Sequence, residues 1–317
     1  MGYDISFHPI DVRLAEERIT PFLAGRGSDD DLDDLVADAV RQAKVRFRAN
    51  AWGLGTSKVV DRADFDTSLY IWGRPFFVTA ESPAAVAETV LRYTRADTDT
   101  VDELARTQLA QLDRALLDRV EPDPSGTLPA DEHLATGFRW KLDLLRAAAV
   151  AVRAGRPTVR NGDDELAAAD VLTGNAQFCT VEFLAALLPG WIDRGRVWPT
   201  ELAENAATDG YAPLGGNDPL LGVLATEFPT LTWESNWTIP TNYAVGGYTA
   251  PTEVRPLRDW LARNAEPLAA VGDQWNDRAP VRRTLRKIDE ALALAESTGT
   301  AFVEAAEIYI PIQGTIN

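Results

Sequence analysis

The sequence predicts an α+β fold that is predominantly α-helical, with a small sheet formed by an N-terminal strand, a strand from Leu69 to Val78 and a C-terminal strand. Apolar residues recur at helical spacing along most of the chain, whereas the alternation typical of strands is confined to these three segments. Expected helices outnumber expected strands, and the strands lie at the two ends and near the first quarter of the chain, which favours α+β over a wound parallel sheet.

The strands are expected from their alternation. Tyr3 to His8 alternates apolar and polar residues, as in a strand with one buried face, and Pro9 is expected to end it. The middle segment, LYIWGRPFFV, contains Gly73 and Pro75, which require a bulge or an edge position. Near the other end of the chain, one face of an extended segment carries Phe302, Ala306, Ile308, Ile310 and Ile312. We therefore expect both ends of the chain in one sheet.

Helices are expected where apolar residues recur at spacings of three and four. The chain as a whole, residues 1–317, is expected to be a single domain with a long irregular loop region at about 208–251, which is rich in Gly, Pro, Asn, Thr and aromatic residues. The expected helices lie at residues 32–43, 101–120, 134–152, 178–191, 255–270 and 281–297.

Composition limits the chemistry that the protein can perform. The chain has 48 acidic and 31 basic residues, a formal charge of −17, and only two histidines and one cysteine. This scarcity excludes most thiol and transition-metal centres. The negative charge disfavours nucleic acid as a partner and favours a basic protein. The alternative is that the acidity reflects salt adaptation or a GC-rich source and has no functional meaning.

The protein is expected to be cytoplasmic. Its one cysteine, Cys179, cannot form an intramolecular disulfide and is expected in the core; nothing at the amino terminus resembles a signal peptide, and no apolar run is long enough to span a bilayer. We therefore expect no membrane partner, and no cofactor apart from calcium, which one loop pattern suggests. The oligomeric state does not follow from the sequence.

His8 is a candidate catalytic residue because it shares a strand face with Asp4 and Ser6, which together are the residue types of a nucleophilic triad. Same-face neighbours on a strand lie about 6.6 Å apart, beyond the roughly 3 Å that a nucleophile and its base require. This spacing favours the alternative, a packed or hydrogen-bonded histidine at the end of a strand.

Residues 121–132, EPDPSGTLPADE, resemble the twelve-residue calcium loop of an EF-hand, with helices expected on both sides. Glutamate stands where the first ligand is normally aspartate, three prolines stiffen the loop and no second copy pairs with it. The alternative is therefore an acidic linker between two helices. The candidate metal ligands are Glu121, Asp123, Ser125, Thr127 and Glu132.

The most basic stretch begins at Arg41 and ends with WGLGTSK, residues 52–58, and Arg46, Arg48 and Lys58 are candidate anion-binding residues. Two glycines beside hydroxyls and a lysine resemble a phosphate-binding loop, but their spacing fits neither a P-loop nor a dinucleotide loop. The alternative is that basic residues at the carboxyl end of a helix complement the helix dipole.

The segment LTWESNWTIPTNY, residues 231–243, combines aromatic side chains with a carboxylate. Trp233, Trp237 and Tyr243 are candidate binding residues and Glu234 is a candidate catalytic residue, because sugars are often held in such settings and glycosidases use a pair of carboxylates. The alternative is that these aromatic residues anchor a long loop onto the core.

The opening MGYDISFHPI, together with WGRPFF at residues 72–77, resembles a group of uncharacterised bacterial proteins that begin with nearly the same residues. The resemblance covers about the first quarter of the chain. It implies a bacterial cytosolic protein, and it implies no activity and no site residue.

Two functions are expected from these observations. The leading hypothesis is a non-enzymatic cytosolic protein that binds a basic protein partner through an acidic surface, in the way that an immunity-type protein neutralises a toxin. The alternative is a carboxylate-dependent hydrolase that acts on a glycan-like substrate and has Glu234 in its site.

Overall fold

The computed structural model describes residues 4–61, 65–70, 73–194, 199–205, 215–216, 218–236, 239, 241–274, 281–306 and 308. The predicted α+β class is confirmed, because helices dominate and a small antiparallel sheet joins the two ends of the chain. The strands are β1 (Asp4–Ile10), β2 (Thr158–Asn161), β3 (Asp164–Ala167), β4 (Trp191–Arg194), β5 (Val245–Thr249) and β6 (Ala301–Ala306). The longer helices are α3 (Asp33–Val59), α5 (Pro83–Thr94), α6 (Val101–Leu112), α7 (Asp131–Arg153), α8 (Ala168–Leu187), α11 (Val254–Arg263), α12 (Ala265–Gly272) and α13 (Val281–Thr298). The shorter ones are α1 (Val12–Leu14), the π-helix η1 (Ala15–Ile19), α2 (Thr20–Leu23), α4 (Thr67–Tyr70), α9 (Pro199–Asn205), α10 (Gly222–Glu227) and the 3-10 helices η2 (Arg114–Asp118), η3 (Asp218–Leu220) and η4 (Pro251–Glu253).

The main sheet has the strand order β4-β1-β6-β5 and is antiparallel throughout. β1 pairs with β6 along its length, from Ile5 opposite Ala306 to Ile10 opposite Ala301. The prediction that an N-terminal and a C-terminal strand share one sheet is therefore confirmed as far as Ala306. Ile310 and Ile312, expected on the same extended segment, lie outside the described residues. The expectation that Pro9 ends β1 is wrong, because the strand continues to Ile10. β4 pairs with β1 only as far as Phe7, so at Pro9 no N–H is needed on the β4 side of the strand.

The predicted strand from Leu69 to Val78 is wrong. Leu69 lies in the single turn of α4, and residues 73–78 join no ladder within the described part of the chain, although the Ile192 N–H of β4 bonds to the Gly73 carbonyl at 3.0 Å. Residues 71 and 72 lie outside the described residues. The alternation in the sequence is real, because Phe76 and Val78 are buried in one hydrophobic cluster and the intervening Phe77 in another. Burial between two cores thus produced a strand-like pattern without a strand.

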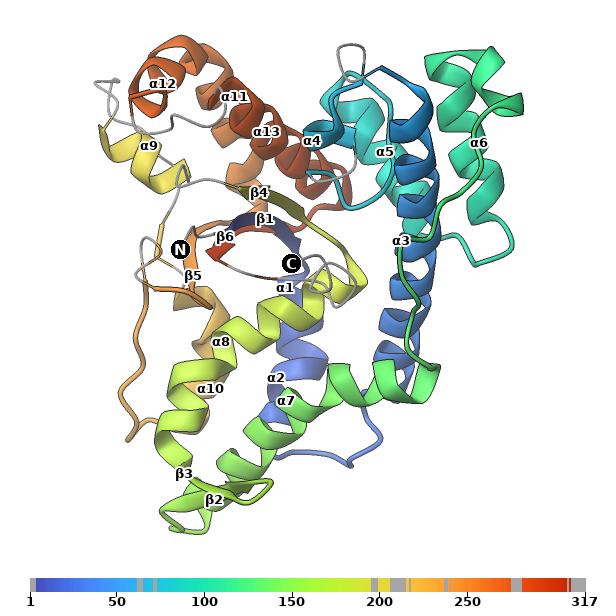
Figure 1. Cartoon of the computed structure of the whole chain (residues 1–317). Coiled ribbons are helices and arrows are strands. Elements are labelled where there is room, and N and C mark those ends of the chain that lie inside the picture. Colours follow the sequence, from blue (N-terminus) through green and yellow to red (C-terminus); the bar gives the residue numbers. More distant parts are fainter. Residues whose placement is uncertain are drawn as a thin grey trace.

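The sheet lies between two layers of helices (Figure 1). On one face, Ile5, Phe7 and Phe302 pack with residues of α5 and α13, and the rings of Phe7 and Phe302 stack at 6.5 Å. On the other face, Ile10 and Val303 pack with residues of α7 and α8. Each fully buried side chain of this size stabilises the fold by about 1.5–3 kcal/mol.

Cys179 of α8 is buried in the second core, as predicted. Burial, with a smaller contribution from Glu182, raises the pKa of its thiol to about 12. The thiol therefore stays protonated and unreactive at neutral pH.

α3 is much longer than its predicted range of 32–43 and stands beside the sheet (Figure 1). It runs through WGLGTSK, so the expected loop at residues 52–58 is helical and no phosphate-binding loop forms there. Gly55 is required for packing, because a Cβ at this position would run into the backbone carbonyl of Glu121. α3 contacts α5, α6, α7 and α8 and thereby carries its side chains into the middle of the molecule.

Several shorter elements differ from expectation. The irregular region predicted at about 208–251 contains α10 and β5, and the helix predicted at 255–270 is divided into α11 and α12. Trp191, the expected end of a helix, is instead the first residue of β4. The hairpin of β2 and β3 was not expected. Of the helices in the described ranges, none has the length and apolar composition needed to cross a membrane.

Candidate functional site

Two of the residues singled out in the sequence, His8 and Arg46, lie together in the interior. His8 is on β1 and, by the alternation of a strand, shares its face with Ile10, which packs in the core that includes α8. Arg46 is in the middle of α3. Both side chains are completely buried, and the pKa of His8 is lowered first by this burial and then by the charge of Arg46. Two nitrogen-rich side chains are therefore held near each other and away from water.

Arg46 carries a buried charge. Its neighbours Val45 and Ala49 are fully buried, and its guanidinium carbon lies 5.7 Å from the centre of the Phe76 ring. Within the described part of the chain, none of its three guanidinium nitrogens has a hydrogen-bond partner. Burial lowers the pKa of Arg46 to about 9, so the group is still protonated at neutral pH. This positive charge faces no counter-charge among the described residues.

His8 is neutral in the folded protein. Burial in the first place, and then the charge of Arg46, lower the pKa of His8 to about 3. A neutral imidazole has one N–H donor and one acceptor nitrogen, and neither is hydrogen-bonded to any residue that the structure describes. Gly190, just before β4, packs its backbone against this ring, and a Cβ there would run into Nδ1. Such a Cβ would also run into the Phe7 carbonyl, so glycine at position 190 lets the chain approach both the β1 backbone and the imidazole.

Gln42 and Asn50 extend this site along α3. They lie one turn before and one turn after Arg46, on the same helix face. Gln42 donates from Nε2 to the Thr94 carbonyl at 2.6 Å, but its Oε1 is buried without a partner in the described ranges, and so is Oδ1 of Asn50. His8, Gln42, Arg46 and Asn50 are called the Arg46 site from here on.

The Arg46 site has the groups needed to hold an anion. A guanidinium presents five N–H donors in one plane, which match the two oxygens of a carboxylate. The two amide oxygens and the acceptor nitrogen of His8 are suited to donors on the same ligand.

A nucleophilic triad is not formed, because the Ser6 hydroxyl donates to the Ala305 carbonyl at 3.2 Å.

The other two basic candidates lie elsewhere on α3. Arg48 makes two bonds to Asp102 of α6, at 2.7 and 2.8 Å, and Trp52 donates to the same carboxylate. Lys58 is paired with Asp123. These two side chains therefore tie α3 to its neighbours, and the structure does not bring them to Arg46.

The loop with the calcium-like sequence packs along α3. The Asp123 N–H donates to the Ala51 carbonyl at 2.7 Å, and Glu121, Ser125, Thr127 and Glu132 are exposed. Among the residues that the structure describes, no three or more His, Cys, Asp or Glu side chains are grouped to hold a metal ion. The geometry thus gives the predicted calcium site no support.

The aromatic segment lies against the core instead of around Glu234. Trp233 donates from Nε1 to the Phe228 carbonyl at 3.3 Å, and the Tyr243 ring meets the edge of Phe178 at 5.9 Å while 61 % of its surface stays exposed. Glu234 is exposed to solvent. Trp237 lies outside the described residues. The glycan hydrolase therefore stays a prediction.

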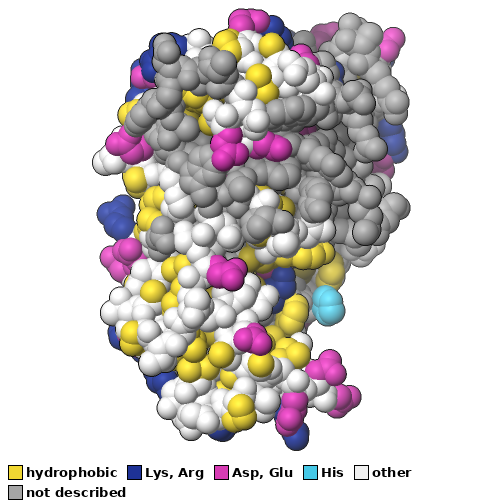
Figure 2. Space-filling model, turned by 90° about the vertical axis from the view of Figure 1, so that its left-hand side faces the viewer, with side chains coloured by type: hydrophobic (Ala, Val, Ile, Leu, Met, Phe, Trp, Pro, Cys, Tyr) yellow, Lys and Arg dark blue, Asp and Glu magenta, His cyan; other side chains and the backbone are white. Residues whose placement is uncertain are grey.

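The densest acidic run, residues 28–34, is largely paired within the protein. Asp29 bonds to Arg146 at 3.0 Å, Asp34 bonds to Arg18 at 2.8 Å, and Asp33 pairs with Arg139. Figure 2 shows one face of the molecule, on which the described acidic side chains are spread among basic and hydrophobic ones. Binding of a basic partner through an acidic surface stays a prediction.

No family model matches the chain, and neither a curated protein nor a solved structure matches it. The ligand of the Arg46 site must therefore be inferred from its chemistry. Sequence reasoning missed Gln42, Asn50 and Gly190, although a signal for the first two is present: polar residues at 42, 46 and 50 recur every four residues and so share one helix face.

Proposed function

We propose that the protein binds a small carboxylate in its interior and that Arg46 holds the carboxylate group. The observation that carries this proposal is the completely buried, charged guanidinium of Arg46, whose nitrogens have no partner within the described residues. His8, Gln42 and Asn50 would complete the site.

The energetics support a ligand. Transferring a charge from water to the interior costs several kcal/mol, and a fold offsets that cost with a partner charge or with hydrogen bonds. Arg46 has neither among the described residues, so the ligand-free protein carries the cost. An anion bound to Arg46 would offset it, because a charge-assisted bidentate pair is among the stronger polar interactions in a protein interior.

The chemistry of the site narrows the ligand class. Arg46 needs an acceptor, whereas Gln42 Oε1 and Asn50 Oδ1 need donors. A carboxylate with a hydroxyl or amino group on the neighbouring carbon offers both, and a simple anion offers only the first. Gln42 and Asn50 are eight residues apart on α3, about 12 Å, so a small ligand held by Arg46 between them would donate to one of these two amides.

Calorimetric titration of the dialysed protein with lactate, alanine, acetate and sulfate, at one ionic strength, tests this proposal. Lactate or alanine is expected to bind more tightly than acetate and sulfate and to raise Tm, because acetate and sulfate carry acceptor oxygens but no donor. Mass spectrometry of the small molecules released when freshly purified protein is denatured extends the search beyond these four probes.

Arg46→Met is expected to abolish binding and the rise in Tm. Arg48→Met is the matched control, since it removes the same charge from the same helix but leaves the Arg46 site intact. The proposal fails if Arg46→Met binds the probes as well as the wild type does, or if the wild type binds no probe and releases no carboxylate.

A further inference from the structure

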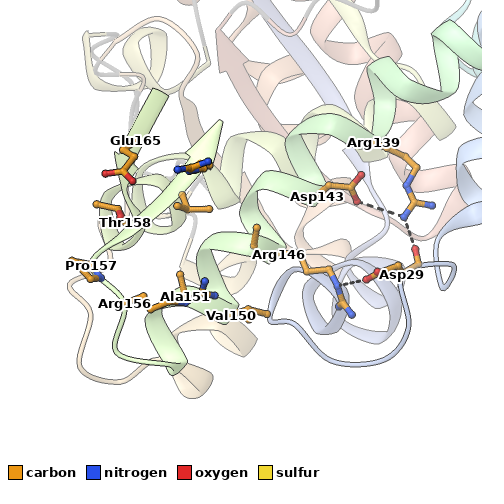
Figure 3. Close-up of a pocket in the computed structure, with 13 residues that line it drawn as sticks. Asp29, Arg139, Asp143, Arg146, Val150, Ala151, Arg156, Pro157, Thr158 and Glu165 are labelled. Atoms are coloured by element: carbon orange, nitrogen blue, oxygen red, sulfur yellow. Dashed lines mark hydrogen bonds and ion pairs between the residues drawn. The ribbon is translucent and has the colours of Figure 1, made fainter. Parts of the chain in front are cut away.

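An open pocket of about 780 Å³ lies outside the Arg46 site, near the carboxyl end of α7. The hairpin of β2 and β3 forms one wall and the loop at Asp29 the other, with Val150 and Ala151 of α7 between them (Figure 3). Val150 keeps 42 % of its surface exposed, which is unusual for a large apolar side chain in this protein.

The wall next to α7 is held in place by the way this helix ends. Gly155 has a positive φ of 66°, its N–H bonds to the Val152 carbonyl, and the Arg156 N–H bonds to the Ala151 carbonyl at 2.9 Å. This is a Schellman motif, and glycine supplies its left-handed residue. Pro157 follows and cannot continue the helix. The start of β2 is therefore fixed relative to α7.

Four arginines and three acidic residues line the pocket. Arg146 bonds to Asp29 at 3.0 Å and to backbone carbonyls, and Arg139 pairs with Asp143 at 3.5 Å. The other two differ, because no residue in the described ranges forms a hydrogen bond or ion pair with the side chain of Arg156 or Arg160. The third carboxylate, Glu165, stands opposite Arg160 in the hairpin without bonding to it.

The hairpin also offers a free backbone edge. β2 and β3 form a sheet of two strands, and no other described strand pairs with β2. The pocket follows β2, since it includes Thr158, Val159 and Arg160 from this strand but only Glu165 from β3. An unpaired edge is a template for another extended chain. The two unpaired arginines lie along this edge: Arg156 comes just before β2, and Arg160 is in the second half of the strand.

We propose that this pocket binds an extended acidic segment of a partner protein, which adds to β2 as a third strand. Acidic side chains about four residues apart on the segment would meet Arg156 and Arg160, and an apolar side chain between them would cover Val150. A basic partner is disfavoured at this place although the whole chain is acidic, because the charges left unpaired in the pocket are mostly positive. This inference does not depend on the Arg46 site.

Fluorescence polarisation with a labelled peptide TEVTVET tests the inference. The measurement is made at about 0.15 M salt, because charges more than roughly 8 Å apart are then screened and the charges in the pocket dominate the electrostatic attraction. The peptide is expected to bind saturably. A peptide with lysines in place of the glutamates is expected to bind at least tenfold more weakly. Two further peptides, one N-methylated at the odd positions and one at the even positions, separate strand addition from simple charge attraction. If the peptide adds as a strand, the N–H groups of one of these sets bond to β2, and methylating that set must lower the affinity at least tenfold.

The double variant Arg156→Glu/Arg160→Glu is expected to lower affinity for TEVTVET at least tenfold. The control Arg114→Glu/Arg119→Glu changes two exposed arginines, at the first residue of η2 and at the residue just after it. It makes the same change in total charge elsewhere and is expected to bind within twofold of the wild type. Circular dichroism checks that both variants fold. The inference is overturned if the wild type does not bind the acidic peptide, if the pocket variant binds it as well as the control does, or if both N-methylated sets bind undiminished.

Discussion

Arg46 and Arg74 are both completely buried arginines, but their surroundings are opposite. Arg74 makes two bonds to Glu290, at 2.9 and 2.5 Å, and a third to the Val78 carbonyl at 2.7 Å. Arg46 has no such bond to any described residue. A buried arginine that serves only the fold is expected to be bonded as Arg74 is, so the contrast supports the proposal that Arg46 binds a ligand.

The largest effect is expected from breaking the satisfied pair. Arg74→Met leaves the Glu290 carboxylate buried, with Trp191 as its one remaining hydrogen-bond donor among the described residues, and should lower the free energy of unfolding by about 3–5 kcal/mol. Urea denaturation measures this loss. Arg74→Met/Glu290→Gln should recover much of it, since no uncompensated charge is left. A loss below about 1 kcal/mol in the single variant would contradict the structural role of Arg74.

The same substitution at Arg46 should have the opposite sign. Arg46→Met removes a buried charge that has no partner in the described structure, so the free energy of unfolding of ligand-free protein should rise by about 1–4 kcal/mol. Urea denaturation of exhaustively dialysed protein gives the value. Destabilisation by more than about 1 kcal/mol would mean that the guanidinium has a structural partner.

Two other buried groups, on opposite faces of the sheet, should make stability respond to pH with opposite signs. Folded His8 stays neutral while the unfolded chain takes up a proton below about pH 6.5, so stability falls as the pH is lowered from 6.5 to about 3. Burial, partly offset by bonds from Thr200 and Gly247, raises the pKa of Glu304 to about 7. The unfolded glutamate loses its proton near pH 4.5, so stability falls as the pH is raised from 4.5 to about 7.

Between pH 4.5 and 6.5 the effects of His8 and Glu304 on stability have opposite signs. A variant that removes one of these groups should therefore show the pH dependence caused by the other. With His8→Gln, stability should fall by about 1.4 kcal/mol for each unit of rising pH; with Glu304→Gln, it should rise by a similar amount. Thermal or urea unfolding at pH 5.0 and 6.0 measures both. If neither variant changes the pH dependence of the wild type, the buried states assigned to these groups are wrong.

The smallest effect is expected at Arg48, whose pair with Asp102 has good geometry but leaves 39 % of the arginine side chain exposed. Arg48→Met should cost less than about 1 kcal/mol, because water screens such pairs. The same urea titration applies. If Arg48→Met lowered the free energy of unfolding as much as Arg74→Met does, solvent exposure would not explain the difference between these two arginines.

The fold class and the outer strands could be predicted because they depend on local periodicity. Tyr3 to His8 and the segment from Phe302 alternate within one strand each, and the apolar stripe that starts at Leu32 marks a helix. The strand from Leu69 to Val78 failed because Phe76, Phe77 and Val78 alternate between two cores, a tertiary arrangement that a local pattern does not distinguish from a sheet.

The site was only partly predictable for a similar reason. His8 and Arg46 were singled out separately, by residue type and by local charge, but nothing local joins position 8 to position 46. Their approach depends on the packing of α3 beside the sheet and on the absence of a side chain at Gly190. The unpaired state of Arg46 is likewise a property of the packed interior, since Arg48, two residues away, has a carboxylate partner.

The most direct test of the central claim is a crystal structure of the protein grown in bromide, with anomalous data collected at the bromine edge. We expect density for an anion, either a bromide or a retained carboxylate, within about 3.5 Å of the Arg46 guanidinium and in contact with His8, Gln42 or Asn50. A guanidinium that instead bonds to a carboxylate of the protein's own chain, with no anion beside it, would contradict the account.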